Sequence, residues 1–330
     1  MTDYQEFDRQ FDGLLAVARQ RLSKEVHYHR LGAVPELHDY MEQFGRVLAA
    51  VYRYGLKDAL VSETAWYASL FKRHGWGKDM LSVILDSWII AIEGIVKMPE
   101  AGRLSGLLRE VRQRLGRMFE TDAQAGEVAE DIQALTRLLT AGDFAGCRDM
   151  LSGVGPEAAI TEYILPAMRY VGRVWQENRL AVYQEHLATQ TALRFIYYLL
   201  GRVKGTRGHT ALVGSVPGEA HFLVTAALST FLELRGWRTW PMGTSLDKEH
   251  IVEAVATLQP EVVFLSLMML ARLPDAIELV EDMRREFPGL LVCLGGRGTV
   301  YAKDVLREMD VLVGHDFAEV EETVKAKLGA

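Results

Sequence analysis

The first 120 residues carry apolar side chains at the three- and four-residue spacing of helices. One such face consists of Phe7, Phe11, Leu14, Leu15 and Ala18. The segment 79–96 is apolar on most of its faces, so we expect it to be the buried helix of this region. Ser62 is a candidate N-cap for the preceding helix, which would end at Arg73. The pattern predicts an all-helical N-terminal domain over residues 1–120.

A small, polar stretch at residues 120–126 separates this domain from a second helical block, and we place a linker there. Breaks at Gly142, at residues 153–156 and at residues 177–179 divide the block into four helices with short connections. This arrangement is typical of an antiparallel four-helix bundle. We assign the bundle to residues 127–204.

Near residue 206 the hydrophobic period changes from that of helices to that of strands. Strand-like runs occupy residues 211–216, 239–241, 262–267, 290–294 and 310–313. Helical patterns separate these runs, which predicts a parallel sheet covered by helices. We expect a flavodoxin-like, Rossmann-type domain with five parallel strands at residues 206–330, so the fold class of the whole chain is α + α/β. Sheets of this kind bind ligands at the carboxyl ends of their strands.

Composition narrows the possible functions. The chain has 330 residues, a formal net charge of −7 and no lysine- or arginine-rich run, so we expect no direct binding to nucleic acid or to an anionic membrane. Its longest apolar run, residues 262–271, is too short to span a bilayer, and its N-terminus lacks a signal-peptide core. Cys147 and Cys293 lie far apart, which predicts buried free thiols in a cytoplasmic protein.

Candidate chemistry follows three of the predicted strands. The first strand leads into Gly218-Glu219-Ala220-His221, the third ends at Ser266, and the fourth ends at Gly295-Gly296. The glycines around Gly218 fit neither a P-loop nor a dinucleotide fingerprint. A carboxylate near a histidine can bind one ring nitrogen and leave the other for a metal. Glycines admit a ligand close to the backbone, and a serine hydroxyl can bond to a buried heteroaromatic base. The alternative is a solvent-facing histidine without a chemical role.

These loops resemble those of cobalamin-binding domains of the base-off, histidine-on kind. That family carries an Asp-x-His-x-x-Gly loop, a Ser-x-Leu-like segment and a Gly-Gly pair. The matching segments here are Glu219-Ala220-His221, Ser266-Leu267-Met268 and Leu294-Gly295-Gly296. Two residues depart from the family pattern, because Glu219 replaces the usual Asp and Val224 the usual Gly.

The resemblance implies a cobalt site at the carboxyl edge of the sheet. His221 would be the lower axial ligand, with Glu219 as its hydrogen-bonding partner. The nucleotide tail of cobalamin would lie in a slot beside Ser266. The other cofactor contacts that we assign to this edge are Gly218, Met268, Gly295 and Gly296.

The helical block resembles the cap of CarH-type light sensors. Trp175 closes one predicted helix, and Glu185-His186 follows ten residues later at the start of the next. The resemblance implies that these side chains surround the upper, adenosyl face of adenosylcobalamin. DNA-binding members carry a histidine after this Trp, where this chain has Gln176. His186 or water is therefore the candidate for the upper cobalt position after photolysis. The alternative is a core tryptophan with a solvated Glu-His face.

The layout of the whole chain resembles that of photocobilins, which hold cobalamin and a bilin such as biliverdin close together. This resemblance assigns no bilin residues. It implies a non-covalent bilin, because neither cysteine lies in the first 120 residues. A helical dimerisation or interaction module is the alternative for that domain, which shows no basic recognition helix.

The sequence therefore predicts a cobalamin-dependent photoreceptor and not an enzyme. Light would break the cobalt–carbon bond of adenosylcobalamin, and loss of the adenosyl group would change contacts between domains or protomers. We expect a homo-oligomer with light-dependent assembly and an unidentified downstream protein. Two alternatives are a corrinoid methyl carrier of a methyltransferase system and a haem-binding sensor of the same fold.

Overall fold

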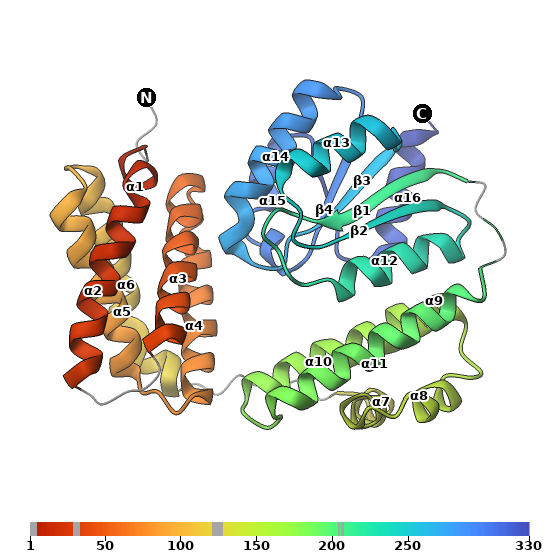
Figure 1. The fold of residues 1–330 in the computed structure, drawn as a ribbon, viewed down its shortest axis with the longest axis horizontal. Coiled ribbons are helices and arrows are strands. Elements are labelled where there is room, and N and C mark those ends of the chain that lie inside the picture. The colour runs from red at the N-terminus through yellow and green to blue at the C-terminus, as the bar shows by residue number, and fades with distance from the viewer. Residues whose placement is uncertain (1–4, 29–33, 121–127, 204, 206–207, 330) are drawn as a thin grey trace. The chain divides into compact units, whose positions relative to one another are not determined.

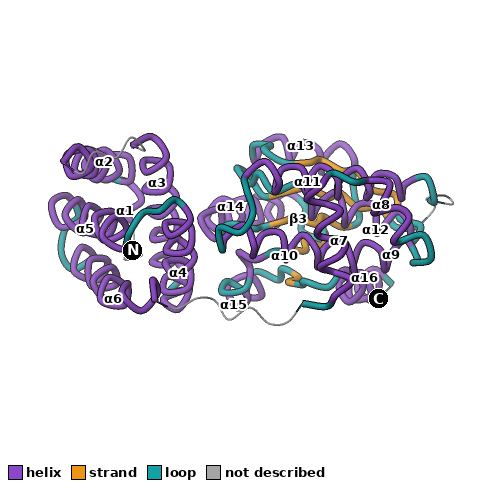
Figure 2. The backbone as a smooth tube through the Cα atoms, turned by 90° about the horizontal axis from the view of Figure 1, so that it is seen from below, coloured by secondary structure: helices purple, strands orange, loops and turns teal. Residues whose placement is uncertain are grey.

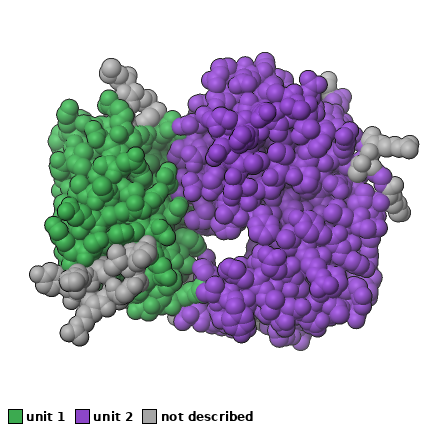
Figure 3. Space-filling view, viewed as in Figure 1, with its two compact units in different colours: residues 1–124 green, residues 125–330 purple. Residues whose placement is uncertain are grey.

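The computed structural model of this chain describes residues 5–28, 34–120, 128–203, 205 and 208–329 (Figures 1 and 2). The chain divides into two compact units, Met1–Gln124 and Ala125–Ala330, which Figure 3 distinguishes by colour. We call them unit 1 and unit 2. The predicted linker lies outside the described residues except for Glu120. Within the described part of the chain, no helix is long and apolar enough to cross a membrane.

Unit 1 is all-helical. Its helices are α1 (Gln5–Arg9), α2 (Phe11–Tyr28), α3 (Val34–Tyr54), α4 (Lys57–Arg73), α5 (Lys78–Ile95) and α6 (Glu100–Glu120). The apolar helix α5 packs against α2, α4 and α6, as its pattern predicted. The predicted N-cap at Ser62 is wrong, because α4 begins at Lys57. Ala59 and Leu60 are buried on the inner face of α4, so packing extends the helix toward the N-terminus.

Trp88 holds α5 against α3. The side chain is fully buried, and its indole N–H donates to the carbonyl oxygen of Met41 at 3.2 Å. Gly45 of α3 lies against the same ring, and a Cβ atom there would come within 2.2 Å of Trp88 Cζ2. The two helices can approach this closely because residue 45 has no side chain.

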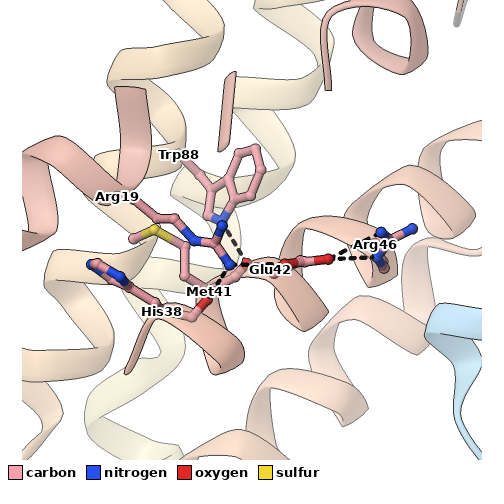
Figure 4. A network of polar contacts seen from close by, with 6 residues as sticks. All are labelled: Arg19, His38, Met41, Glu42, Arg46 and Trp88. Atoms are coloured by element: carbon pink, nitrogen blue, oxygen red, sulfur yellow. Dashed lines mark hydrogen bonds and ion pairs between the residues drawn. The ribbon is translucent and has the colours of Figure 1, made fainter. Parts of the chain in front are cut away.

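A polar network joins α2 to α3 (Figure 4). Arg19 of α2 donates to Glu42 Oε2 at 2.8 Å and to the carbonyl oxygen of His38 at 3.4 Å. Arg46 donates to Glu42 Oε1 at 3.0 Å. Burial alone would raise the pKa of Glu42, but its hydrogen bonds and ion pairs with Arg46 and Arg19 outweigh burial and lower that pKa. One carboxylate thus joins two guanidinium groups on separate helices.

We expect this network to make unit 1 less stable in acid. Because the folded pKa of Glu42 is lowered, its carboxylate stabilises the fold above the unfolded pKa of about 4.5. That contribution is lost as the pH falls through the folded pKa, and for a pair this exposed it is on the order of 1 kcal/mol. Hydrogen exchange of α2 and α3 amides across the acid range measures it. Glu42→Gln should flatten this part of the profile, and an unchanged profile in the variant would contradict the assignment.

Unit 2 begins with a helical layer that we call the cap. It comprises α7 (Glu130–Ala141), α8 (Phe144–Met150), α9 (Pro156–Ala158), the π-helix η1 (Ala159–Ile164), α10 (Leu165–Gln176) and α11 (Val182–Leu200). α9, η1 and α10 follow one another without a break, so the described cap residues form four helices, as predicted. Gly142 and Asn178 end helices in the left-handed conformation, with φ of 73° and 56°.

The rest of unit 2 is built on a parallel sheet in the order β2-β1-β3-β4-β5. Its strands are β1 (Thr210–Ser215), β2 (Arg238–Gly243), β3 (Val262–Ser266), β4 (Leu291–Gly295) and β5 (Leu312–Val313). Its helices are α12 (Leu223–Leu234), α13 (Lys248–Leu258), α14 (Leu273–Glu286), α15 (Lys303–Glu308) and α16 (Phe317–Leu328), with short 3-10 turns η2 (Leu270–Arg272) and η3 (Arg297–Thr299). This strand order is flavodoxin-like, so the predicted α + α/β fold class is confirmed.

The cap packs on the sheet domain through α11, which lies along α12. Phe195 and Leu199 of α11 share one hydrophobic core with Phe231 of α12. Cys147 in the cap and Cys293 in β4 are both free and buried, which confirms the prediction of buried free thiols. Burial raises the thiol pKa of Cys147 to about 11 and that of Cys293 to about 12.

Candidate functional site

The predicted candidate residues gather at the carboxyl edge of the sheet. Ser215, Ser266 and Gly295 are register partners in the last row of the neighbouring strands β1, β3 and β4. The Val216 N–H donates to the Ser266 carbonyl oxygen at 3.1 Å, which continues the row beyond β1. The loops after these three strands therefore leave the sheet side by side.

The β1 loop holds His221 through the carboxylate of Glu219. Glu219 is 1% exposed, and its Oε1 accepts hydrogen bonds from Nδ1 of His221, from the His221 amide at 3.1 Å and from the Ala220 amide at 3.0 Å. The His221 side chain is 55% exposed. The predicted hydrogen bond between the two side chains is present, and Nε2 is the ring nitrogen left for a ligand.

Charges from two layers act on this histidine. The largest influence on its pKa is the hydrogen bond to Glu219, which raises it. Burial of the ring lowers the pKa but does not cancel this effect. Glu185, on α11 of the cap, raises the pKa of His221 further, and Arg297 after β4 lowers it. The start of α11 therefore lies close enough to the β1 loop for their charges to interact. Burial would raise the pKa of Glu219, but its hydrogen bonds, that with His221 first, lower it overall.

Ser266 presents an unusual buried hydroxyl. Its side chain is 5% exposed, and its Oγ has no hydrogen-bond partner among the described residues. A buried polar atom without a partner costs about 1–3 kcal/mol, so such atoms are uncommon and call for an explanation. A ligand that hydrogen-bonds to this hydroxyl would explain it. The predicted slot for the nucleotide tail beside Ser266 would provide such a contact.

Gly295 and Gly296 have a backbone reason to be glycine. A Cβ atom at Gly295 would lie 2.8 Å from the Gly314 carbonyl oxygen, and one at Gly296 would lie 2.5 Å from that of Leu267. Gly296 also has a φ of 109°. Sδ of Met268 would lie 3.2 Å from the same Cβ, so Met268 and Gly296 are neighbours. The structure thus explains the glycine pair without a ligand, whereas the sequence argument rested on ligand access.

The cap residues lie at the α10–α11 connection. Trp175 is half-buried in the last turn of α10, and Glu185 accepts a hydrogen bond from Thr189 Oγ1 at 3.0 Å. His186 is 73% exposed, with Nδ1 3.1 Å from the Val182 carbonyl oxygen and 2.9 Å from Glu185 Oε2. His186 differs from His221 in that the hydrogen-bond partner of its Nδ1 is a backbone carbonyl, although a carboxylate lies nearby and Nε2 is likewise left for a ligand.

The α10–α11 connection and the carboxyl ends of the strands lie on the same side of unit 2 in Figure 1. On the face drawn in Figure 3, unit 2 is hollowed between the cap and the sheet domain. Together with the effect of Glu185 on His221, this arrangement brings the two predicted groups to one region of unit 2.

Several residues in this region were not among the predicted candidates. Val182 and Tyr183, in the first turn of α11, are exposed apolar side chains next to the Glu-His pair. Their signal in the sequence is a pair of large apolar residues at the start of a helix. Arg272 packs its guanidinium on Gly218, and Arg297 acts electrostatically on the site. No local pattern distinguishes these arginines from ordinary surface ones.

Comparison with known proteins supports a corrinoid site. Residues 209–327 match the family model of the B12 binding domain, and residues 131–200 match a second B12 binding domain model. The chain is 28% identical over 149 residues to the HTH-type transcriptional repressor CarH of Myxococcus xanthus. It is 22% identical over 141 residues to trimethylamine corrinoid protein 2 of Methanosarcina acetivorans.

These likenesses concern parts of the chains. The two matches cover 45% and 41% of this chain, and they span 50% and 64% of the respective relatives. The structure is also similar to the monomethylamine corrinoid protein of Methanosarcina barkeri, with a TM-score of 0.52 and 17% identity over 60% of this chain and 96% of that one. This last likeness concerns the fold alone. The chain therefore carries two B12-binding family domains, the cap at residues 131–200 and the sheet domain at residues 209–327.

Proposed function

We propose that this chain is a light sensor that uses adenosylcobalamin. The observation that carries the proposal is His221, whose Nδ1 is engaged by Glu219 at the carboxyl edge of one B12-binding domain. The other B12-binding domain, the cap, carries the Glu185-His186 pair. The likeness to CarH, which spans 149 residues, supports the same reading. The Trp175 and Glu-His spacing supports adenosylcobalamin over other corrinoids.

The residues present fit such a cofactor. Nε2 of His221 would hold the cobalt, because Glu219 engages Nδ1. The Ser266 hydroxyl, which has no hydrogen-bond partner among the described residues, would bond to the nucleotide tail. The remaining contacts at the sheet are Gly218, Met268, Gly295 and Gly296. When bound, adenosylcobalamin supplies a cobalt–carbon bond that visible light breaks. Trp175, Glu185 and His186 would surround the adenosyl group.

A spectrum recorded before and after illumination tests this function. We expect the chain loaded with adenosylcobalamin to change its visible spectrum under light and to change its elution volume on size-exclusion chromatography. The second change would reflect the light-dependent homo-oligomer that we propose as the signalling state. A loaded chain whose spectrum and elution volume are the same in darkness and in light would contradict the proposal.

The cap histidine provides a second test. Gln176 offers no imidazole, so His186 is the candidate upper ligand in the illuminated chain. We expect His186→Ala to alter the spectrum after illumination, while dark affinity changes much less than in a variant at His221, because His221 is the proposed cobalt ligand in the dark chain. His250→Ala is the matched control, since His250 is an exposed histidine on α13 beside Glu253. Identical illuminated spectra in both variants would remove the role of His186.

A corrinoid methyl carrier is the second candidate function. The likeness to trimethylamine corrinoid protein 2 favours it. A carrier would pass a methyl group from bound methylcobalamin to a separate methyltransferase in darkness, and light would not change its elution volume. Metal analysis separates both candidates from a haem-binding sensor. A haem-binding sensor would contain iron, whereas either corrinoid protein would contain cobalt.

The bilin stays a prediction for unit 1. Absorption spectra of the chain expressed with and without biliverdin test it directly. A band that appears with biliverdin alone and survives removal of cobalamin would place a second chromophore on this chain. A downstream protein also stays a proposal, and we propose no direct contact with nucleic acid.

A further inference from the structure

Glu219 contacts a second loop as well as the loop that carries it. Its Oε2 accepts hydrogen bonds from the Met268 amide at 3.0 Å and from the Met269 amide at 2.9 Å, both in the loop after β3. Its Oε1 serves the β1 loop. The backbone carbonyl of Glu219 also accepts from the Ser245 amide, after β2, at 3.3 Å. One residue therefore meets three of the loops at the carboxyl edge.

The carboxylate is fully used by these contacts. Two carboxylate oxygens offer about four lone-pair sites, and five donors point at them here. Glu219 is also almost completely buried. It has no capacity left to bind a ligand itself, so its contacts act on the shape of the site.

We propose that Glu219 is a positioning residue that fixes the β1 loop and the β3 loop to each other. One carboxylate then sets both the orientation of His221 and the position of the segment from Ser266 to Met269. The inference rests on the proposed function only in taking His221 as the axial ligand. It explains the glutamate at this position, because the two groups of donors lie on opposite oxygens and belong to separate loops.

The length of the side chain decides whether both groups can be reached. Aspartate is shorter by one carbon–carbon bond, about 1.5 Å. The donors now lie at about 3 Å from the carboxylate oxygens. If the carboxylate moves back by the length of that bond, the donors of one loop fall outside hydrogen-bond range. The donors of the β1 loop belong to the next two residues and stay within reach. Glu219→Asp should therefore keep the contact with His221 and lose the contacts with Met268 and Met269.

Hydrogen exchange of the cofactor-free chain in darkness tests this coupling. In Glu219→Asp we expect the Met268 and Met269 amides to exchange at least about tenfold faster, while the Ala220 and His221 amides keep their rates. In Glu219→Ala all four should exchange faster. Unchanged rates at Met268 and Met269 in Glu219→Asp would overturn the proposal.

The matched control is another buried carboxylate of unit 2. Glu321 is 0% exposed and accepts a hydrogen bond from Trp237 Nε1 at 2.9 Å. Glu321→Asp should leave exchange at Met268 and Met269 unchanged. If Met268 and Met269 also exchange faster in Glu321→Asp, the faster exchange reflects general loosening of unit 2 and not loss of the contacts between Glu219 and the β3 loop.

Binding in darkness gives a second readout, with hydroxocobalamin and cobinamide as probes. Cobinamide lacks the nucleotide tail, so it depends less on the β3 loop. For Glu219→Asp we expect hydroxocobalamin affinity to fall about 10- to 100-fold and cobinamide affinity to fall less. After the bound hydroxocobalamin is reduced to cobalt(II) with a chemical reductant, the nitrogen splitting in its electron paramagnetic resonance spectrum should persist, because His221 keeps its partner. Equal losses for both probes, or loss of this splitting, would overturn the separation of roles.

These measurements do not depend on light. A chain that shows the exchange pattern but ignores illumination retains the positioning role of Glu219 and loses the sensor function. A chain that responds to light but keeps its exchange rates in Glu219→Asp gives the reverse result. The two proposals can therefore fail separately.

Discussion

Replacing His221 with alanine should lower the affinity of the chain for cobalamin by at least about 100-fold, because loss of an outer partner alone costs 10- to 100-fold. The side chain is the only imidazole on the β1 loop, and Glu219 already holds its Nδ1. Binding titrations followed by visible spectroscopy measure the loss. Any corrinoid that still binds should show the spectrum of cobalt without an axial imidazole.

The His221→Ala result needs a control for general damage. The side chain is more than half exposed, so its removal should leave no cavity in the core. We expect the cofactor-free variant to lose at most about 1–3 kcal/mol of stability, because the buried Glu219 carboxylate loses one hydrogen-bond partner, and we expect His250→Ala on the surface of α13 to leave stability unchanged. A variant that keeps both normal affinity and the normal cobalt spectrum would disprove the axial-ligand assignment.

Replacing Trp88 with alanine should destabilise unit 1 by about 3–5 kcal/mol, the usual cost of truncating a buried tryptophan. Trp88 is fully buried, contacts Phe7 and Phe11, and donates its indole N–H to the Met41 carbonyl. The change removes the ring and leaves that carbonyl without its indole donor. Hydrogen exchange of α3 and α5 amides in the full chain measures the effect. Trp66→Ala, at a half-buried position of the same unit, should cost less.

A double substitution tests the contact itself. Gly45→Ala alone places a methyl group 2.2 Å from the Trp88 ring and should cost about 1–3 kcal/mol through overpacking. In Gly45→Ala with Trp88→Ala, the methyl group enters the space that the ring has left. The pair should therefore be less destabilised than the sum of the single variants. Additive losses would mean that the two residues are not coupled.

Sequence periodicity was enough to predict most elements, because helix and strand spacing depend on neighbouring residues. It placed the sheet strands within a few residues. Periodicity did not predict the start of α4 at Lys57. Burial of Ala59 and Leu60 in unit 1 outweighs the N-cap preference of Ser62. A cap preference is a local effect, and helix packing is not.

The candidate site shows the same division between what local sequence predicts and what tertiary packing decides. His221, Ser266 and Gly295 could be grouped from sequence, because alternating strands and helices imply that strand ends share an edge. Only the tertiary structure decided which donors the Glu219 carboxylate accepts, why Gly295 and Gly296 must be glycine, and that Glu185 acts on His221. These contacts join residues far apart in the chain, over distances of a few ångströms that depend on strand register and loop shape. Residue type and spacing therefore determined the kind of site, and packing determined its geometry.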